Sequence, residues 1–165
     1  MPALYGLIGF PLTHSFSPAY FKKKFAAQNI DALYELFPIK DIADFPELIT
    51  ANPALEGLNV TFPYKESIIP YLHEMDPIAT EIGAVNCITI RGGRLKGFNT
   101  DATGFEQSLN PLLQSQHTHA LILGTGGSSK AVAYALKQLG ITSQQVSRSE
   151  KEGAITYQSL TPSPR

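Results

Sequence analysis

The chain has 165 residues, of which 43% are hydrophobic and 16% are charged, and its formal net charge at pH 7 is −1. This composition is ordinary for a water-soluble globular protein, and the length suffices for one large core or two small domains. The nearly neutral charge balance gives no electrostatic reason to expect nucleic acid or an anionic membrane as a partner. A single cysteine, Cys87, excludes an internal disulfide and is compatible with a reducing compartment. We therefore expect a cytoplasmic protein. Because no run of about 18 apolar residues occurs, no membrane span is expected.

Apolar runs bounded by turn residues predict strands along the whole chain. These strands lie at residues 4–9, 32–38, 55–60, 85–90, 94–97, 119–123 and 144–147. Helical spacing and capping residues predict the helices between them. The helices lie at residues 18–29, from Asp41 or Asp44 to about 50, in two short segments between 64 and 82, from 100 to about 112, and from the glycine turn to about 139. The Gly92-Gly93 pair predicts a hairpin.

The alternation of strands and helices predicts an α/β fold. The polar stretch 114–117 is the predicted boundary between a substrate-binding domain, residues 1–113, and a nucleotide-binding domain, residues 118–165. A doubly wound nucleotide domain needs more strands than we predict after residue 118, so this second domain is expected to be an incomplete Rossmann-like domain. The pattern fades after Ser149, and residues 161–165 are predicted to form a loose end.

Residues 121–131 follow the order strand, glycine turn, helix start, which is typical of dinucleotide-binding sites. Gly124 permits the tight turn, Gly126 lets a pyrophosphate approach the backbone, and the helix start supplies amide donors. Ser129 stands where a third glycine is usual. The alternative is a turn with a purely structural role, but the preceding strand and the amphipathic helix that follows favour a cofactor site.

The end of the next predicted strand indicates which dinucleotide binds. NAD-specific sites usually place an acidic residue there, whereas Ser147, Arg148 and Ser149 stand here. The planar guanidinium of Arg148 suits a 2′-phosphate, and the two hydroxyls add contacts. The sequence therefore favours NADP over NAD, with a solvated surface arginine as the alternative.

Two serines, Ser15 and Ser17, precede a predicted helix in which Pro18 fits the first position. Ser17 fits an N-cap, and such a helix start attracts a carboxylate through its amides, its dipole and both hydroxyls. By spacing alone, ordinary capping is the preferred interpretation. We expect His14 to be structural, and no metal site is predicted.

Lys65 and Asp101 each follow a predicted strand and a turn, at the edge where open α/β sheets bind ligands. Hydride transfer to or from a secondary alcohol requires a group that exchanges the hydroxyl proton. A lysine beside a carboxylate can do so, although taken singly Lys65 fits an exposed lysine and Asp101 fits an N-cap.

Together these segments resemble the shikimate dehydrogenase family. The resemblance rests on motifs in the family's order at residues 15–18, 59–65, 83–86, 97–101 and 124–127, and it spans about residues 4 to 149. It implies an NADPH-dependent reduction of 3-dehydroshikimate to shikimate, a step on the way to chorismate and aromatic amino acids.

The resemblance also implies residue roles. Ser15 and Ser17 would hold the substrate carboxylate, and Lys65 and Asp101 would form the catalytic pair. The ring hydroxyls would contact Thr61, Lys65, Asn86 and Asp101. The pyrophosphate would contact Gly124, Thr125, Gly126, Gly127 and Ser128, and the 2′-phosphate would lie near Ser147, Arg148 and Ser149.

The chain departs from the family pattern in three ways. Cys87 replaces a common threonine, Ser147 replaces an asparagine, and nothing matches the family's C-terminal portion, which includes a helix with a substrate-binding glutamine. Two alternatives therefore stay open: a quinate/shikimate dehydrogenase with relaxed cofactor use, and a non-catalytic shikimate-binding module. The oligomeric state is not predicted, and we expect little or no turnover from this chain without the missing portion.

Overall fold

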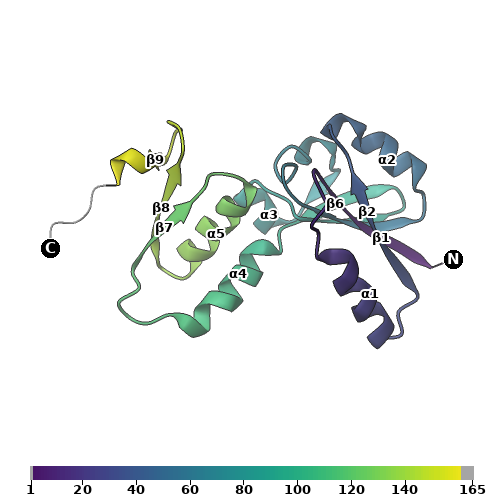
Figure 1. Cartoon of the computed structure of the whole chain (residues 1–165), viewed down its shortest axis with the longest axis horizontal. Helices are drawn as coiled ribbons and strands as arrows, with labels where there is room; N and C mark the ends of the chain where they lie inside the picture. The colour runs from purple at the N-terminus through teal and green to yellow at the C-terminus, as the bar shows by residue number, and fades with distance from the viewer. Residues whose placement is uncertain (1, 161–165) are drawn as a thin grey trace. The chain divides into compact units, whose positions relative to one another are not determined.

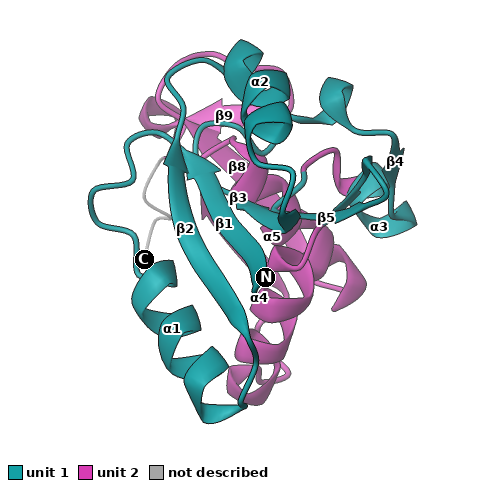
Figure 2. Ribbon diagram, turned by 90° about the vertical axis from the view of Figure 1, so that its right-hand side faces the viewer, with its two compact units in different colours: residues 1–81, 85–98 teal, residues 82–84, 99–165 magenta. Residues whose placement is uncertain are grey.

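The structure is a computed structural model that describes residues 2–160, and its α/β class agrees with the sequence prediction. The chain forms two compact units, shown in different colours in Figure 2. Unit 1 comprises residues 1–81 and 85–98, and unit 2 comprises residues 82–84 and 99–165. The predicted loose end at residues 161–165 lies outside the described residues.

Unit 1 is built on a mixed sheet that, within residues 2–160, contains six strands. In spatial order these are β2 (Ala32–Pro38), β1 (Ala3–Gly9), β3 (Leu55–Val60), β5 (Cys87–Arg91), β6 (Arg94–Phe98) and β4 (Glu74–Met75). β1 is parallel to both β2 and β3, and β6 is parallel to β4, whereas β5 runs antiparallel to β3 and β6. The carboxyl ends of β1, β2, β3, β4 and β6 and the amino end of β5 therefore lie along one edge, which we call the site edge.

Helices α1 (Ser17–Ala27) and α2 (Phe45–Ala51) lie on opposite faces of this sheet (Figure 1). On the α2 side, Ile8 and Phe45 belong to a core of buried residues and are 0% and 1% exposed. On the α1 side, the aromatic rings of the helix contact aromatic residues of β1 and β2. The strand period of two explains this division, because neighbouring residues of β1 face opposite helices.

Short elements connect these parts of unit 1. They are the 3₁₀ turns at Ile42–Asp44 and Ile69–Tyr71 and the helix α3 (Pro77–Ile82). The Asp41 carboxylate accepts a hydrogen bond from Ala43 N–H at 2.9 Å and so caps the first 3₁₀ turn, as one of the two sequence alternatives predicted. The β5–β6 hairpin is also confirmed, with positive φ angles of 54° at Gly92 and 75° at Gly93.

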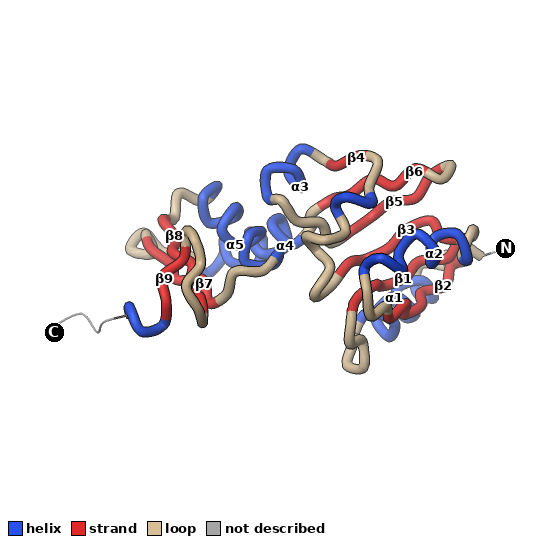
Figure 3. The backbone as a smooth tube through the Cα atoms, turned by 90° about the horizontal axis from the view of Figure 1, so that it is seen from above, coloured by secondary structure: helices blue, strands red, loops and turns tan. Residues whose placement is uncertain are grey.

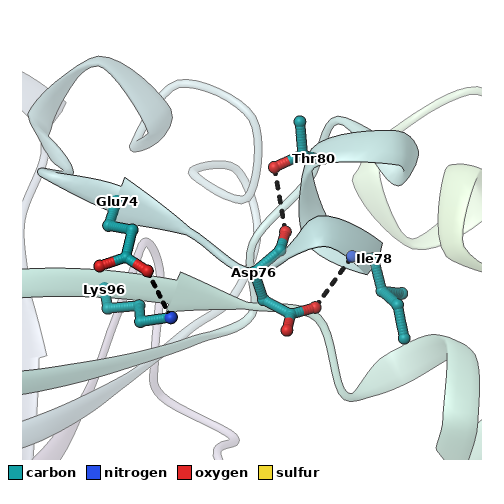
Figure 4. A network of polar contacts seen from close by, with 5 residues as sticks. All are labelled: Glu74, Asp76, Ile78, Thr80 and Lys96. Atoms are coloured by element: carbon teal, nitrogen blue, oxygen red, sulfur yellow. Dashed lines mark hydrogen bonds and ion pairs between the residues drawn. The ribbon is translucent and has the colours of Figure 1, made fainter.

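A polar network fixes the start of α3 next to the edge strand β4 (Figure 4). Asp76 accepts a hydrogen bond from Ile78 N–H through its carboxylate and one from the Thr80 hydroxyl through its carbonyl. Glu74 of β4 forms an ion pair with Lys96 of β6. The sequence analysis missed β4, because a strand of two residues shows no alternation that could be recognised.

Unit 2 contains, within residues 2–160, a parallel sheet of three strands in the order β7-β8-β9 (Figure 3). Its helices α4 and α5 pack on each other through Ala102 and Ala131, which are 2% and 0% exposed. The elements are α4 (Asp101–Leu109), a 3₁₀ turn (Asn110–Leu112), β7 (His119–Leu123), α5 (Gly127–Gln138), β8 (Thr142–Ser147), β9 (Ala154–Thr156) and a last 3₁₀ turn (Tyr157–Ser159).

One feature of unit 2 differs from the sequence analysis. The pattern was expected to fade after Ser149, but β9 adds a third parallel strand, too short for its periodicity to be read. The compact units separate near residue 98, because α4 packs against α5. Compactness alone does not test the predicted functional division into residues 1–113 and 118–165, which stays a prediction. The helices that the structure describes are all too short or too polar to traverse a lipid bilayer.

Candidate active site

The two predicted anion-binding serines lie at the start of α1, on the site edge of unit 1. The helix begins at Ser17, and Phe16 occupies the N-cap position, so the prediction that Ser17 is the N-cap is wrong. Ser15 takes part of that role, because its Oγ accepts a hydrogen bond from Ser17 N–H at 3.4 Å. Both serines line a hollow of ≈ 390 Å³ together with Thr61. The structure thus brings three predicted substrate-binding residues to one concave surface.

Thr61 owes its place to the close approach of β1 and the turn after β3. A Cβ atom on Gly9 would lie 2.4 Å from Cγ2 of Thr61, so only glycine fits at the end of β1. Thr61 N–H donates to the carbonyl of Ile8 at 2.9 Å, which continues the strand pairing into the turn. The turns after β1 and β3 each contain a cis X-Pro peptide bond.

Lys65 and Asn86 are also held at the site edge through their main chains. Val85 N–H donates to the carbonyl of Lys65 at 2.7 Å, and Val60 N–H donates to the carbonyl of Asn86 at 2.9 Å. Asn86 N–H in turn donates to the carbonyl of Phe98 at 3.0 Å. The backbone of Asn86 is therefore fixed by β3 and β6, and that of Lys65 by the loop residue Val85; both side chains are half-buried.

Asp101 is the first residue of α4 and belongs to unit 2. The sequence analysis left open that Asp101 is an N-cap, but the capping group is Asn99, which is 7% exposed. Its Oδ1 accepts from the N–H groups of Asp101 and Ala102 at 3.1 and 3.2 Å, while its Nδ2 donates to the carbonyl of Ala84 at 2.9 Å. Because Lys65 belongs to unit 1, its pairing with Asp101 stays a prediction.

The glycine turn lies between β7 and α5, as the sequence predicted. Gly124 has a φ of 140°, and a Cβ there would lie 3.1 Å from Oγ of Ser129, so the position requires glycine. Its N–H donates to the carbonyl of Val146 at 3.0 Å, which ties the turn to the end of β8. Around Gly126, by contrast, no described atom lies within 4 Å of a Cβ at that position. The turn is thus closed at its first glycine and open at Gly126, where the backbone can be approached.

The predicted cofactor residues of the turn and of the β8 end share one hollow of ≈ 580 Å³ in unit 2. It is lined by Gly124, Thr125, Gly126, Ser147, Arg148 and Ser149, together with Leu123, Val146, Lys151 and Tyr157. Gly127 and Ser128 form the first turn of α5, just beyond this hollow. Lys151 Nζ donates to the carbonyl of Thr125 at 3.2 Å, so a second cation joins Arg148 there.

A contact that sequence reasoning missed joins β2 to β3 in unit 1. The Tyr34 hydroxyl, on β2, donates to Oδ1 of Asn59 at 2.7 Å. Burial raises the pKa of Tyr34 to about 12. Asn59 was part of a recognised motif without an assigned role, and nothing in the sequence around Tyr34 indicated it. Among residues 2–160, no group of three or more His, Cys, Asp or Glu side chains is arranged to hold a metal ion.

The family model for the shikimate dehydrogenase substrate binding domain matches residues 7–88, which cover the serines, Thr61, Lys65 and Asn86. A shikimate dehydrogenase (NADP(+)) from Halothermothrix orenii is 45% identical over 140 residues, covering 82% of this chain and 48% of its own length. The chain belongs to the shikimate dehydrogenase family. It spans about half the length of the curated relatives that it matches.

Solved structures of the family have the same fold. Shikimate dehydrogenase 1 from Peptoclostridium difficile is 39% identical, with a TM-score of 0.83 over 93% of this chain and 59% of that one. The Thermus thermophilus shikimate 5-dehydrogenase in complex with NADP(H) and shikimate is 33% identical, with a TM-score of 0.79 over 87% and 55% of the two chains. A quinate dehydrogenase from Corynebacterium glutamicum in complex with NAD is 34% identical, with a TM-score of 0.78 over 88% and 55%.

Proposed function

We propose that the chain binds shikimate and 3-dehydroshikimate in unit 1 and NADP(H) in unit 2, as part of an oxidoreductase that reduces 3-dehydroshikimate to shikimate. The observation that carries this proposal is the site edge of unit 1. Ser15 and Ser17 follow β1, Thr61 and Lys65 follow β3, and Asn86 precedes β5. Hydroxyl, ammonium and amide groups thus come together where a hydroxylated ring acid needs donors and acceptors.

The chemistry assigns a separate task to each group. The two serine hydroxyls and the start of α1 suit the carboxylate of the substrate, since helix starts attract anions. Thr61 and Asn86 suit ring hydroxyls, because each can donate and accept. Lys65 is proposed to give a proton to the carbonyl oxygen as it becomes a hydroxyl, and to take it back in the reverse direction. Asp101 is proposed to orient the same hydroxyl.

The residues of unit 2 fit a dinucleotide with a 2′-phosphate. The backbone at Gly126 is open, the start of α5 supplies amide donors, and two cations line the hollow beside them. The β8 end carries Ser147, Arg148 and Ser149, and an acidic group for the ribose 2′-hydroxyl of NAD does not stand there. When bound, NADPH supplies the hydride for the reduction. We propose that Arg148 binds the 2′-phosphate and that the amides at 124–128 hold the pyrophosphate.

Two measurements on this chain test the proposal: calorimetric titration with shikimate, and shikimate-dependent reduction of NADP⁺ followed by absorbance. We expect shikimate to bind. If turnover occurs, we expect Lys65→Met and Asp101→Asn to lower the rate by about 10² to 10⁴, the usual contribution of proton transfer. Binding without turnover would identify the chain as a shikimate-binding module, and absence of binding by the folded chain would refute the proposed substrate.

Quinate with NAD is the second candidate, supported by the structural similarity to the Corynebacterium glutamicum quinate dehydrogenase. The two candidates differ in which cofactor and which ring acid should bind more tightly. The arginine at the end of β8 predicts tighter binding of NADP⁺ than of NAD⁺, and the paired serines favour shikimate. Tighter binding of both quinate and NAD⁺ would reverse this preference.

A further inference from the structure

Asn99 stands between β6, which ends at Phe98, and α4, which begins at Asp101. Its side chain is 7% exposed, and burying an amide costs free energy unless its donors and acceptors find partners. The fold supplies partners on both sides of this amide, the start of α4 on one side and the carbonyl of Ala84 on the other. The two sides of the amide therefore have separate tasks.

The oxygen of the amide fixes the start of α4. Oδ1 accepts hydrogen bonds from the N–H groups of Asp101 and Ala102 at 3.1 and 3.2 Å, and these are donors that a helix cannot satisfy by itself. Because the N–H of Asp101 is held, the backbone at that residue is held too, and with it the direction of the Cα–Cβ bond. The carboxylate of Asp101 therefore projects from a fixed point.

The nitrogen of the same amide ties the start of α4 to a segment that lies fifteen residues earlier in the sequence. Nδ2 donates to the carbonyl of Ala84 at 2.9 Å. Ala84 is fully buried and belongs to one core cluster with Ala102 of α4 and Ala131 of α5, so its carbonyl is a rigid anchor. The amide thus adds a polar tie to a part of unit 2 that is otherwise held by apolar packing.

The partners also determine which way the amide faces and which side chains could replace it. If the amide were turned over, its N–H donors would meet the N–H groups of α4, and its oxygen would meet the carbonyl of Ala84. An ionised aspartate at position 99 keeps the acceptor for α4 but has no donor for Ala84, and an alanine provides neither. The two tasks of Asn99 can therefore be separated by substitution.

We propose that Asn99 is a positioning residue that places the carboxylate of Asp101 for the substrate, acting through the main chain at the start of α4. This role rests on the proposed function, in which Asp101 orients the reacting hydroxyl. The positioning belongs to the oxygen of the amide, because that atom holds the N–H of Asp101. The nitrogen contributes to the stability of unit 2 through its bond to Ala84.

A ligand-free experiment tests whether both bonds form in solution. Urea unfolding is measured for the wild type, Asn99→Asp and Asn99→Ala, with Asp41→Ala as a matched control that removes a similar cap, on the N–H of Ala43, from unit 1. We expect all three substitutions to lower the unfolding midpoint, because each leaves a polar group without its hydrogen-bond partner. Unchanged midpoints for both Asn99 variants would overturn the inference.

Calorimetric titration of the same variants with shikimate measures the positioning itself. We expect Asn99→Ala to weaken binding about three- to tenfold, the effect of one misplaced hydrogen bond. Asn99→Asp should restore binding close to that of the wild type despite its lower unfolding midpoint, and Asp41→Ala should also bind like the wild type. In an Asp101→Ala background, Asn99→Ala should weaken binding little further, because its effect passes through the missing carboxylate.

The outcomes separate this role from the proposed function. Equal affinity of the wild type and Asn99→Ala would overturn the positioning role, and so would equal weakening by Asn99→Ala and Asn99→Asp. Weakening by the same factor with and without the carboxylate of Asp101 would show that Asn99 does not act through it. If the wild type itself binds no shikimate, the proposed substrate fails, and the positioning role fails with it.

Discussion

The two units hold their candidate sites in different ways. In unit 1 the polar groups lie on turns tied by main-chain hydrogen bonds to a wide mixed sheet with a helix on each face. In unit 2 the cofactor residues lie on two loops at the end of a narrow parallel sheet. The candidate substrate site therefore depends on packing around the sheet, and the candidate cofactor site depends mainly on one glycine turn.

The apolar side chains of unit 1 are also more deeply buried than those of the first strand of unit 2. Ile8, Ile68 and Ile88 of unit 1 are 0 to 1% exposed, whereas Leu121 and Leu123 on β7 of unit 2 are 55% and 67% exposed. Of that strand, Ile122 at 7% exposure and the partly buried Ala120 pack toward the helices. Since apolar burial is the main source of stability, unit 1 should be the more stable and cooperative part of the chain.

Substitutions of one large apolar residue in each unit should show the greatest contrast. Phe45→Ala removes a ring that is 1% exposed, and we expect it to lower the free energy of unfolding by about 3–5 kcal/mol. Leu123→Ala, at a residue that is 67% exposed, should change it by less than about 0.5 kcal/mol. Urea unfolding followed by circular dichroism measures both. Equal losses would show that the exposed face of β7 is covered in solution.

Substitutions at the two glycines of the turn should distinguish an effect on stability from an effect on cofactor binding. Gly124→Ala forces a side chain into a backbone with φ of 140°, so we expect a loss of about 1–3 kcal/mol of stability along with weaker NADP⁺ binding. Gly126→Ala meets open space and should leave stability nearly unchanged. It should nevertheless weaken NADP⁺ binding, because its methyl group lies where the pyrophosphate approaches. Full affinity in Gly126→Ala would place the pyrophosphate elsewhere.

Arg148 should decide the choice between the two nucleotides. Arg148→Met removes the planar donor group. We expect about 10- to 150-fold weaker binding of NADP⁺ with little change for NAD⁺, since a charge-assisted hydrogen bond contributes about 1.5–3 kcal/mol. Arg91→Met in unit 1 is the matched control at another exposed arginine. Titration with both nucleotides measures the effect, and equal weakening for both would contradict a 2′-phosphate contact.

The smallest expected effect concerns the rate at which the thiol of Cys87, in unit 1, is chemically modified. Burial raises the pKa of its thiol, so less thiolate is present at any pH below that pKa than in a free cysteine. At pH 8 we expect a disulfide reagent to modify this thiol several-fold more slowly than it modifies glutathione, because the thiol is partly buried. A rate equal to that of glutathione would indicate that the strand start opens freely.

The sequence predicted most regular elements of both units. The ranges of β2, β3 and β7 agree with the prediction residue for residue, because apolar runs between turn residues specify such strands. The strands β4 and β9 were missed because two or three residues are too few to show the alternation of a strand. The capping by Asn99 and the contact between Tyr34 and Asn59 could not be predicted, since each depends on neighbours brought together by the fold.

The central claim is that the site edge of unit 1 recognises shikimate with Lys65 among its contacts. Calorimetric titration of shikimate into the folded chain and into Lys65→Met tests this most directly. The account predicts saturable binding to the wild type and at least about tenfold weaker binding to the variant, as expected when a charged hydrogen-bond donor is lost. Equal affinity in both chains, or no binding to the wild type, would contradict it.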